Sequence, residues 1–259
     1  MPSFHFLDHG VHAAAFNMAR DEFLFRHASG AWLCVYGWEP AAISLGYGQA
    51  AEKELDLAAV RRSGLDVVRR ITGGRAVLHD LEITYSLAAD TGDIFGPDLH
   101  ATYHAIALAL QRTLVHLGVM AELEKGSARD SRAKAGASAP CFASTARHEL
   151  KVNGKKIIGS AQRREKGRFL QHGSLIIRHQ RDITDYLKLD SESRAAYRAV
   201  LGTESITLSE TGAKDSDWPA LAGAFRKGFA ESLGIELEPG VLPDDALNAI
   251  TALSVKYRC

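Results

Sequence analysis

The chain has 259 residues, of which 46% are hydrophobic, and this is enough to bury a large core in one large or two small domains. The 31 basic and 31 acidic side chains give a formal net charge of +0, so no overall field attracts nucleic acid or an anionic membrane. The three cysteines are far apart and odd in number, which disfavours a disulfide framework and indicates a reducing compartment.

The N-terminal segment lacks the basic and apolar regions of a secretory signal. No apolar run approaches the roughly 20 residues that a membrane-spanning helix needs. We therefore expect a cytoplasmic protein that has neither a nucleic acid nor a membrane as its partner.

The first half of the chain combines short strands with longer helices. Apolar residues at three- and four-residue steps predict a helix over residues 12–27. Segments rich in β-branched and aromatic residues predict strands, and Gly64 and Gly118 mark the ends of helices. The expected strands cover residues 32–36, 43–47, 66–71, 75–79 and 83–88, and the further helices cover residues 52–63 and 99–117.

In the second half, residues 126–140 are rich in Lys, Arg, Ser and Ala and are expected to form a mobile loop. Strands over 149–152 and 155–158 flank Asn153-Gly154, a strong signal for a hairpin with a type I′ turn. Another strand is expected over 169–177, before helices over 191–201, 217–233 and 243–256. Because the strands come in antiparallel runs, the predicted fold class is α+β, a mixed sheet with helices packed on it.

The first candidate for chemistry is the segment from Arg70 to Asp80, in which Gly73-Gly74 lies between two strands. Glycines let a backbone approach a ligand closely, and Arg70 and Arg75 could neutralise a phosphate or a carboxylate. On these residues alone, a tight turn with solvated arginines explains the pattern equally well.

Cys141 is the candidate nucleophile. It follows a proline at the end of the basic segment, and positive neighbours lower the pKa of a thiol and favour the reactive thiolate. Cys34 lies in an apolar strand and fits the role of a small buried hydrophobe, whereas Cys259 is terminal and expected to be inert. From the residues alone, a structural role for Cys141 stays open.

Two further segments carry polar residues on predicted strands. Lys156 belongs to the hairpin strand, which would hold its amine rigidly beside the small residues Gly159 and Ser160. His172, which precedes Gly173, could act as a base or orient a substrate. A solvated lysine and an ordinary surface or core histidine are the simpler explanations.

Together, and in this order, these segments resemble the biotin/lipoate protein ligase superfamily over roughly residues 30–180. The matching segments are Arg70-x-Thr72-Gly73-Gly74-x-Ala76-Val77-x-His79-Asp80, Lys156-x-x-Gly159-Ser160-Ala161 and His172-Gly173-Ser174-Leu175. The resemblance implies a mixed sheet of about seven strands with flanking helices. It also implies a single catalytic domain over residues 1–259, with a core over about 30–215 and C-terminal helices packed on it.

Two features resemble the LipM-type octanoyltransferase branch of this superfamily. Arg75 stands where ATP-dependent ligases usually carry a third glycine, and Pro140-Cys141-Phe142 resembles the nucleophile segment of the transferases, fifteen residues before Lys156 as it is there. The LipB branch fits poorly, because its cysteine lies well beyond the His-Gly segment. The resemblance implies catalysis by Cys141 and Lys156, and substrate binding by Arg70, Thr72, Gly73, Gly74, Arg75, Ala76, His79, Gly159, Ser160, His172 and Gly173.

The implied reaction is octanoyl transfer in lipoate biosynthesis. Octanoyl-acyl carrier protein would present a thioester on its phosphopantetheine arm, and Cys141 would attack the carbonyl. A lysine of a lipoyl domain, such as the glycine cleavage H protein or an E2 subunit, would then take the acyl group. Lys156 would lower the pKa of the thiol or hydrogen-bond the carbonyl. Because thioester to amide is downhill, we expect no ATP, cofactor or metal.

Two other functions stay open at this point. An ATP-dependent lipoate ligase catalytic domain would use Lys156 on an acyl-adenylate and would have no role for Cys141. A non-enzymatic module that binds acyl carrier protein would use neither residue as a catalyst.

Overall fold

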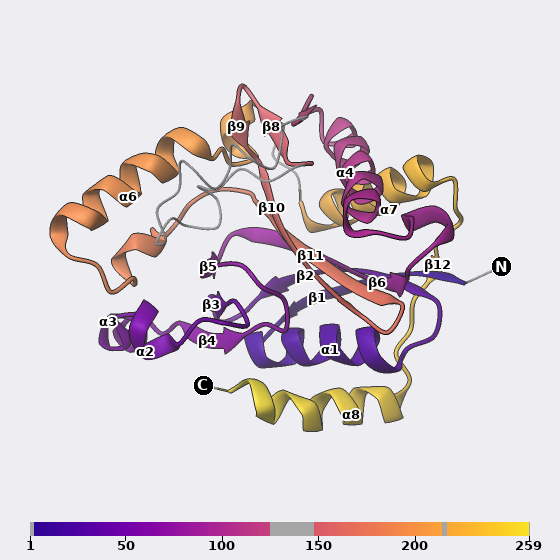
Figure 1. The fold of residues 1–259 in the computed structure, drawn as a ribbon, viewed down its shortest axis with the longest axis horizontal. Helices are drawn as coiled ribbons and strands as arrows, with labels where there is room; N and C mark the ends of the chain where they lie inside the picture. The colour runs from indigo at the N-terminus through magenta and orange to yellow at the C-terminus, as the bar shows by residue number, and fades with distance from the viewer. Residues whose placement is uncertain (1–2, 125–147, 214–216, 259) are drawn as a thin grey trace.

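The computed structural model describes residues 3–124, 148–213 and 217–258, and its centre is a six-stranded mixed sheet (Figure 1). Its strand order is β10-β11-β6-β2-β1-β12. The pairs from β10 to β2 are antiparallel, whereas β1 pairs in parallel with both β2 and β12. These strands are β1 (Phe4–His12), β2 (Ala31–Trp38), β6 (Glu82–Asp90), β10 (Ile158–Glu165), β11 (Arg168–Ile176) and β12 (Glu238–Pro239).

Two smaller sheets flank the main one. The first has the order β4-β3-β5, and the second has the order β7-β8-β9. Their strands are β3 (Ala42–Leu45), β4 (Asp66–Arg69), β5 (Val77–His79), β7 (Glu122–Leu123), β8 (Leu150–Val152) and β9 (Lys155–Lys156). The α+β class is confirmed, but the described strands divide among three sheets instead of forming one sheet of about seven, because pairing depends on contacts between distant segments.

Helices cover both faces of the main sheet. The helices α1 (Ala14–His27) and α8 (Asp244–Ser254) lie on one face, and α4 (Leu99–His116) and α7 (Trp218–Leu233) lie on the other (Figure 1). Apolar side chains of the sheet and of these helices form two clusters, one on each side. The remaining helices of the described residues are α2 (Ala51–Glu54), α3 (Leu57–Arg62) and α6 (Ser191–Glu204). The described 3₁₀ turns are η1 (Asp93–Phe95), η3 (Ile183–Asp185), η4 (Ser209–Thr211) and η5 (Val255–Tyr257).

Local chemistry explains where the elements agree with the prediction and where they differ. The hairpin at Asn153-Gly154 is confirmed, because these residues have φ of 52° and 77° and join the antiparallel strands β8 and β9. The helix predicted over 52–63 is two short helices. Asp56 lies between them and accepts hydrogen bonds from the backbone N–H of Ala58 (3.1 Å) and Ala59 (3.0 Å), so it starts a new helix.

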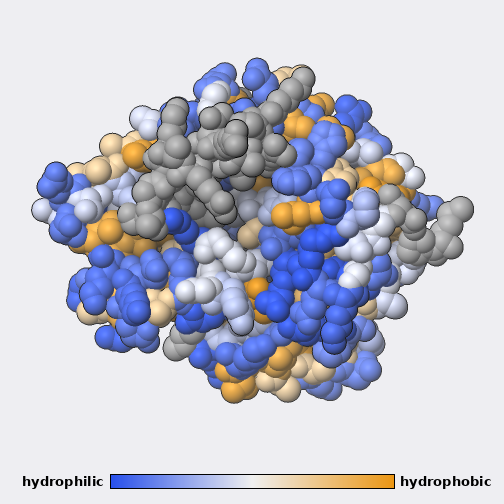
Figure 2. Space-filling model, viewed as in Figure 1, coloured by the Kyte–Doolittle hydropathy of each residue, from blue (hydrophilic) through white to orange (hydrophobic). Residues whose placement is uncertain are grey.

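The strand β1 was not predicted, and β10 extends beyond the predicted segment into a charged stretch. The partner of β1 is β2, which lies beyond the helix α1, and a local pattern does not report this pairing. The partner of β10 is the next strand, β11, and the two form a hairpin that turns at Lys166 and Gly167, which have φ of 50° and 78°. No helix within the described residues is long and apolar enough to cross a membrane. Figure 2 shows hydrophilic side chains over most of the visible face, with hydrophobic residues in separate small patches.

Candidate active site

A narrow cavity, here called the acyl cavity, brings together the three segments that the sequence analysis singled out. Its walls come mainly from α1, from β2, from the β4-β3-β5 sheet and from the hairpin of β10 and β11. The lining residues are Met18, Tyr36, Trp38, Ser44, Arg70, Val77, His79, Thr84, Gly159, Ser160, Ala161, His172, Gly173 and Ser174. Six of the predicted substrate-binding residues therefore meet at one place.

The pairing of β10 with β11 places the lysine strand and the His-Gly strand side by side. Ser160 lies opposite Gly173, and Ala161 lies opposite His172. A Cβ atom on Gly173 would lie 2.6 Å from the carbonyl oxygen of Gly159 and 2.6 Å from Oγ of Ser160. Glycine at this position is therefore required for the close approach of the two strands beside the cavity.

The turn formed by residues 72–75, here called the glycine turn, packs against Gly46, which the sequence analysis did not single out. Gly74 has a φ of +94°, and its carbonyl oxygen lies 2.0 Å from the position that a Cβ atom on Gly46 would take. The backbone N–H of Tyr47 also donates to the carbonyl of Thr72 at 2.9 Å. Gly46 lies within the strand predicted over residues 43–47, and a glycine inside a strand was the only sequence signal for this contact.

Arg70 holds the glycine turn in place. Its Nη1 donates to the carbonyl of Ser44 at 2.8 Å, and its Nη2 donates to the carbonyls of Gly73 (3.0 Å) and Arg75 (2.7 Å). The guanidinium is buried and lines the acyl cavity. Binding of an anion by Arg70 stays a prediction, whereas its bracing of the turn is visible.

His172 connects this turn to the helix α1. Its Nδ1 lies 3.1 Å from Oδ2 of Asp21, and its Nε2 lies 2.6 Å from Oγ1 of Thr72. Burial lowers the pKa of His172, so we treat the imidazole as neutral, with Nδ1 donating to Asp21 and Thr72 donating to Nε2. Both ring nitrogens are thus occupied, and the ring positions Thr72.

Asp21 is the second residue that the sequence analysis missed. Its buried carboxylate accepts hydrogen bonds from Tyr36 (2.8 Å), Ser86 (2.8 Å) and Arg20 (3.2 Å) as well as from His172. Burial by itself opposes ionisation, but these hydrogen bonds and the charge of Arg20 hold the pKa of Asp21 below its usual value. An acidic residue within a helix normally faces solvent, so the sequence carries little signal for it.

His79, which also lines the acyl cavity, has a similar environment. Its Nδ1 lies 2.8 Å from Oε1 of Glu82, its Nε2 lies 2.7 Å from Oγ of Ser44, and its ring stacks on Trp38 at 3.9 Å. Burial disfavours the carboxylate form of Glu82, but the charge and hydrogen bond of His79, with hydroxyl donors, hold its pKa below the usual value. The wall of the acyl cavity is therefore fixed by satisfied polar contacts.

Lys156 forms an ion pair with Glu149, and their side chains are 6% and 11% exposed. Lys156 does not line the acyl cavity, but Glu149 lines a neighbouring small cavity that shares Ser160 with it. Cys141 lies outside the described residues, as do residues 126–140 and Cys259. A position of Cys141 beside Lys156 stays a prediction.

Cys34 fits the structural role predicted for it. It lies fully buried in β2, and burial raises the pKa of its thiol to about 12. Within the described ranges, no cluster of three or more His, Cys, Asp or Glu side chains could hold a metal ion.

Four of the predicted motif residues, Thr72, Gly73, Gly74 and Arg75, form the turn and do not line the acyl cavity. Ala76 lines a second, larger cavity that adjoins the first, and Arg75 lines a third. The structure thus divides the predicted motif between residues of the cavity wall and residues that shape the turn behind it.

Known proteins provide an independent comparison. Residues 13–230 match the lipoyl protein ligase A/B catalytic domain. The octanoyltransferase LipM of Lysinibacillus sphaericus is 37% identical over 100% of this chain and 98% of its own length. The octanoyltransferase LipM of Symbiobacterium thermophilum is also 37% identical, over 98% and 95% of the two chains.

Solved structures share the fold. A bi-partite lipoate protein ligase from Thermoplasma acidophilum superposes with a TM-score of 0.79 at 22% identity, covering 99% of this chain and 93% of the other. A lipoate-protein ligase A bound with ATP has a TM-score of 0.76 at 22% identity, covering 98% and 95%. The chain therefore belongs to the lipoyl protein ligase A/B family and, within it, is an octanoyltransferase of lipoate biosynthesis.

Proposed function

We propose that this octanoyltransferase takes its acyl group from octanoyl-acyl carrier protein and delivers it to a lysine of a lipoyl domain, through a thioester on Cys141. The main support is the convergence of the Arg70–Asp80 segment, which contributes Arg70, Val77 and His79, with β10 and the His-Gly strand on one cavity. Met18, Trp38 and Val77 give this cavity apolar walls. Burial at about 25 cal/mol per Å² would make an acyl tail a strong anchor there. The cavity has a volume of about 30 Å³ in this structure, so its walls must move apart to admit an eight-carbon tail.

The proposed chemistry has two steps. In the first, the Cys141 thiolate attacks the thioester carbonyl, its carbon–sulfur bond forms, and the bond to the carrier sulfur breaks, so the carrier thiolate leaves and takes up a proton. In the second, the amine of the acceptor lysine attacks the new thioester, an amide bond forms, and the Cys141 thiolate is regenerated as a proton is released. Each step exchanges one acyl bond for another, so neither ATP, a cofactor nor a metal is required.

Lys156 is proposed to act beside the thiol. The ion pair with Glu149 holds its ammonium in a buried place on a hairpin strand, which restricts its movement. There it would lower the pKa of the Cys141 thiol or hydrogen-bond the acyl carbonyl. The proposed acceptor is the glycine cleavage H protein or an E2 subunit, because each carries a lipoyl domain.

Intact-protein mass spectrometry after incubation with octanoyl-acyl carrier protein tests this function. The wild-type chain should gain one octanoyl group that is lost on addition of a lipoyl domain, and Cys141→Ser should gain none. Cys34→Ser is the matched control and should be acylated normally. Near-normal transfer by Cys141→Ser would rule out the covalent mechanism, and product formation that needs ATP and free octanoate would favour a ligase.

A further inference from the structure

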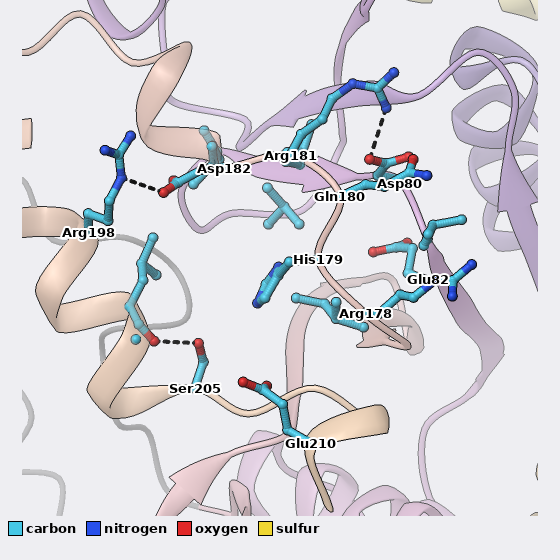
Figure 3. Close-up of a pocket in the computed structure, with 18 residues that line it drawn as sticks. Asp80, Glu82, Arg178, His179, Gln180, Arg181, Asp182, Arg198, Ser205 and Glu210 are labelled. Atoms are coloured by element: carbon cyan, nitrogen blue, oxygen red, sulfur yellow. Dashed lines mark hydrogen bonds and ion pairs between the residues drawn. The ribbon is translucent and has the colours of Figure 1, made fainter. Parts of the chain in front are cut away.

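A second cavity, here called the arm cavity, adjoins the acyl cavity and has a volume of about 390 Å³ (Figure 3). Its walls come mainly from residues 76–82, which include part of β5 and the start of β6, from residues 178–183 and from α6. We propose that it binds the neutral pantetheine part of the arm that carries the acyl group of the donor. This inference rests on the proposed function, because it assumes a carrier-bound thioester as the donor.

The two cavities share a wall. Val77 lines both of them. Glu82 lines the arm cavity, while its carboxylate is hydrogen-bonded to His79 and Ser174, which line the acyl cavity. An acyl tail in the acyl cavity therefore places the atoms beyond its thioester close to the arm cavity, where the rest of the donor must continue.

The size and lining of the arm cavity suit a flexible chain of mixed polarity. A volume of about 390 Å³ lies within the range of small-molecule sites. Leu78, Ile183 and Leu201 provide apolar surface, and Gln180 and Ser205 provide amide and hydroxyl groups. The pantetheine arm likewise alternates polar and apolar groups, because it contains two amides, a hydroxyl and a dimethyl-substituted carbon.

Charge decides which part of the arm enters. The acidic residues of the lining outnumber its arginines, four to three: Asp80, Glu82, Asp182 and Glu210 against Arg178, Arg181 and Arg198. Two of the arginines are already paired, Arg181 with Asp80 at 2.9 Å and Arg198 with Asp182 at 2.6 Å (Figure 3). A phosphate would meet a net negative lining, so the phosphate of the carrier stays outside and the neutral amides enter.

Asp80 offers one specific contact. Its Oδ2 is buried and makes no hydrogen bond of normal geometry within the described residues, although it lies 2.9 Å from Nη1 of Arg181. A buried carboxylate oxygen of this kind is a strong acceptor for an amide N–H. The aspartate that ends the Arg70–Asp80 segment would thus contact the donor arm and not its acyl tail.

Gly202 provides a way to block the arm cavity without touching the acyl cavity. It lies on α6 in the arm-cavity lining, and a Cβ atom there would have no neighbour within 4 Å. Gly202→Leu therefore fills space at the cavity and improves helix propensity. Gly223→Leu is the matched control, because Gly223 lies on α7, its Cβ position is equally open, and it lines neither cavity.

The experiment compares release of thiol from octanoyl-carrier protein, octanoyl-phosphopantetheine, octanoyl-pantetheine and S-ethyl octanethioate, which lacks the arm. Wild-type kcat/KM should be similar with and without the phosphate and at least about tenfold lower for the ethyl thioester. Gly202→Leu should raise KM and so lower kcat/KM about tenfold for the three donors with an arm. The kcat/KM for the ethyl thioester should stay unchanged. Gly223→Leu should match the wild type with every donor.

Three results would overturn the inference. An equal loss with all four donors would mean that Gly202→Leu acts on the acyl site or on folding, and no loss with any would mean that the arm lies elsewhere. A large loss on removal of the phosphate would place the anion in the binding site. Failure of the wild-type chain to release thiol from any donor would instead contradict the proposed function.

Discussion

The hydroxyl of Thr72 lies 2.6 Å from Nε2 of His172, and this contact joins the glycine turn to a strand 100 residues away in the sequence. The other ring nitrogen of His172 is held by Asp21 at 3.1 Å. The helix α1 therefore takes part in shaping the turn, although none of its residues was predicted to belong to the site.

Asp21→Asn should disrupt this connection. The substitution removes the negative charge that faces the buried guanidinium of Arg20, and breaking a buried ion pair costs about 3 kcal/mol. We expect a loss of that size in the free energy of unfolding, measured with urea. Octanoyl transfer should also slow, because an amide oxygen accepts a weaker hydrogen bond than a carboxylate and holds His172, and through it Thr72, less firmly. Ser86→Ala removes one hydrogen bond to Asp21 and should cost about 1 kcal/mol. Equal losses for the two variants would contradict the assignment.

Gly46→Ala should displace the glycine turn. The new methyl group would lie 2.0 Å from the carbonyl oxygen of Gly74, so the turn must move. Overpacking of this kind costs about 2 kcal/mol, and acylation should slow because Arg70 and Thr72 move with the turn. Gly48→Ala, whose Cβ has no neighbour within 4 Å, is the control and should keep normal stability and activity. A fully active Gly46→Ala would show that the turn is not needed in this position.

The pair of Lys156 and Glu149 allows structure and catalysis to be separated. Glu149→Gln removes the carboxylate that pairs with the buried ammonium of Lys156 and should destabilise the fold by about 3 kcal/mol. The double variant Glu149→Leu with Lys156→Met replaces both charges by apolar groups and should recover most of that loss. It should still fail to acylate Cys141 at the wild-type rate, measured as the burst of carrier thiol.

Lys155→Ala is the control for the lysine. Its Nζ donates to the carbonyl of Gly202 at 2.9 Å on the exposed side of the hairpin, so its loss should leave acylation nearly unchanged. A larger effect of Lys155→Ala on acylation than that of the double variant Glu149→Leu with Lys156→Met would show that the wrong lysine has been assigned to the reaction.

The free energy of unfolding should decrease as the pH is lowered, because His9 binds a proton less readily in the folded chain. Nη1 of Arg20 lies 3.0 Å from Nδ1 of His9, and burial, with the charges of Arg20 and His12, lowers the pKa of His9 to about 4. Between the unfolded value of 6.5 and about 4, the unfolded chain binds more protons, so stability decreases as the pH falls through this window. Urea unfolding at several pH values should show this slope, and His9→Gln should reduce it. An unchanged slope in His9→Gln would assign the effect to other groups.

Several properties of this protein are determined by the sequence alone. The positive φ that a type I′ turn requires is met by Asn153-Gly154, so the hairpin that carries Lys156 follows from two adjacent residues. The glycine, lysine and His-Gly segments likewise identify the family, because each motif is a local pattern of residue types in a set order.

Only the tertiary structure determines which other residues contact these motifs. Asp21, Glu149 and Gly46 are ordinary residues in the sequence and acquire their roles only through contacts with His172, Lys156 and Gly74. The division of the strands among three sheets and the arm cavity beside Val77 also arise from pairings between segments far apart in the chain. Local residue preferences do not report such contacts, because the burial of a side chain and its contact partners depend on the whole fold.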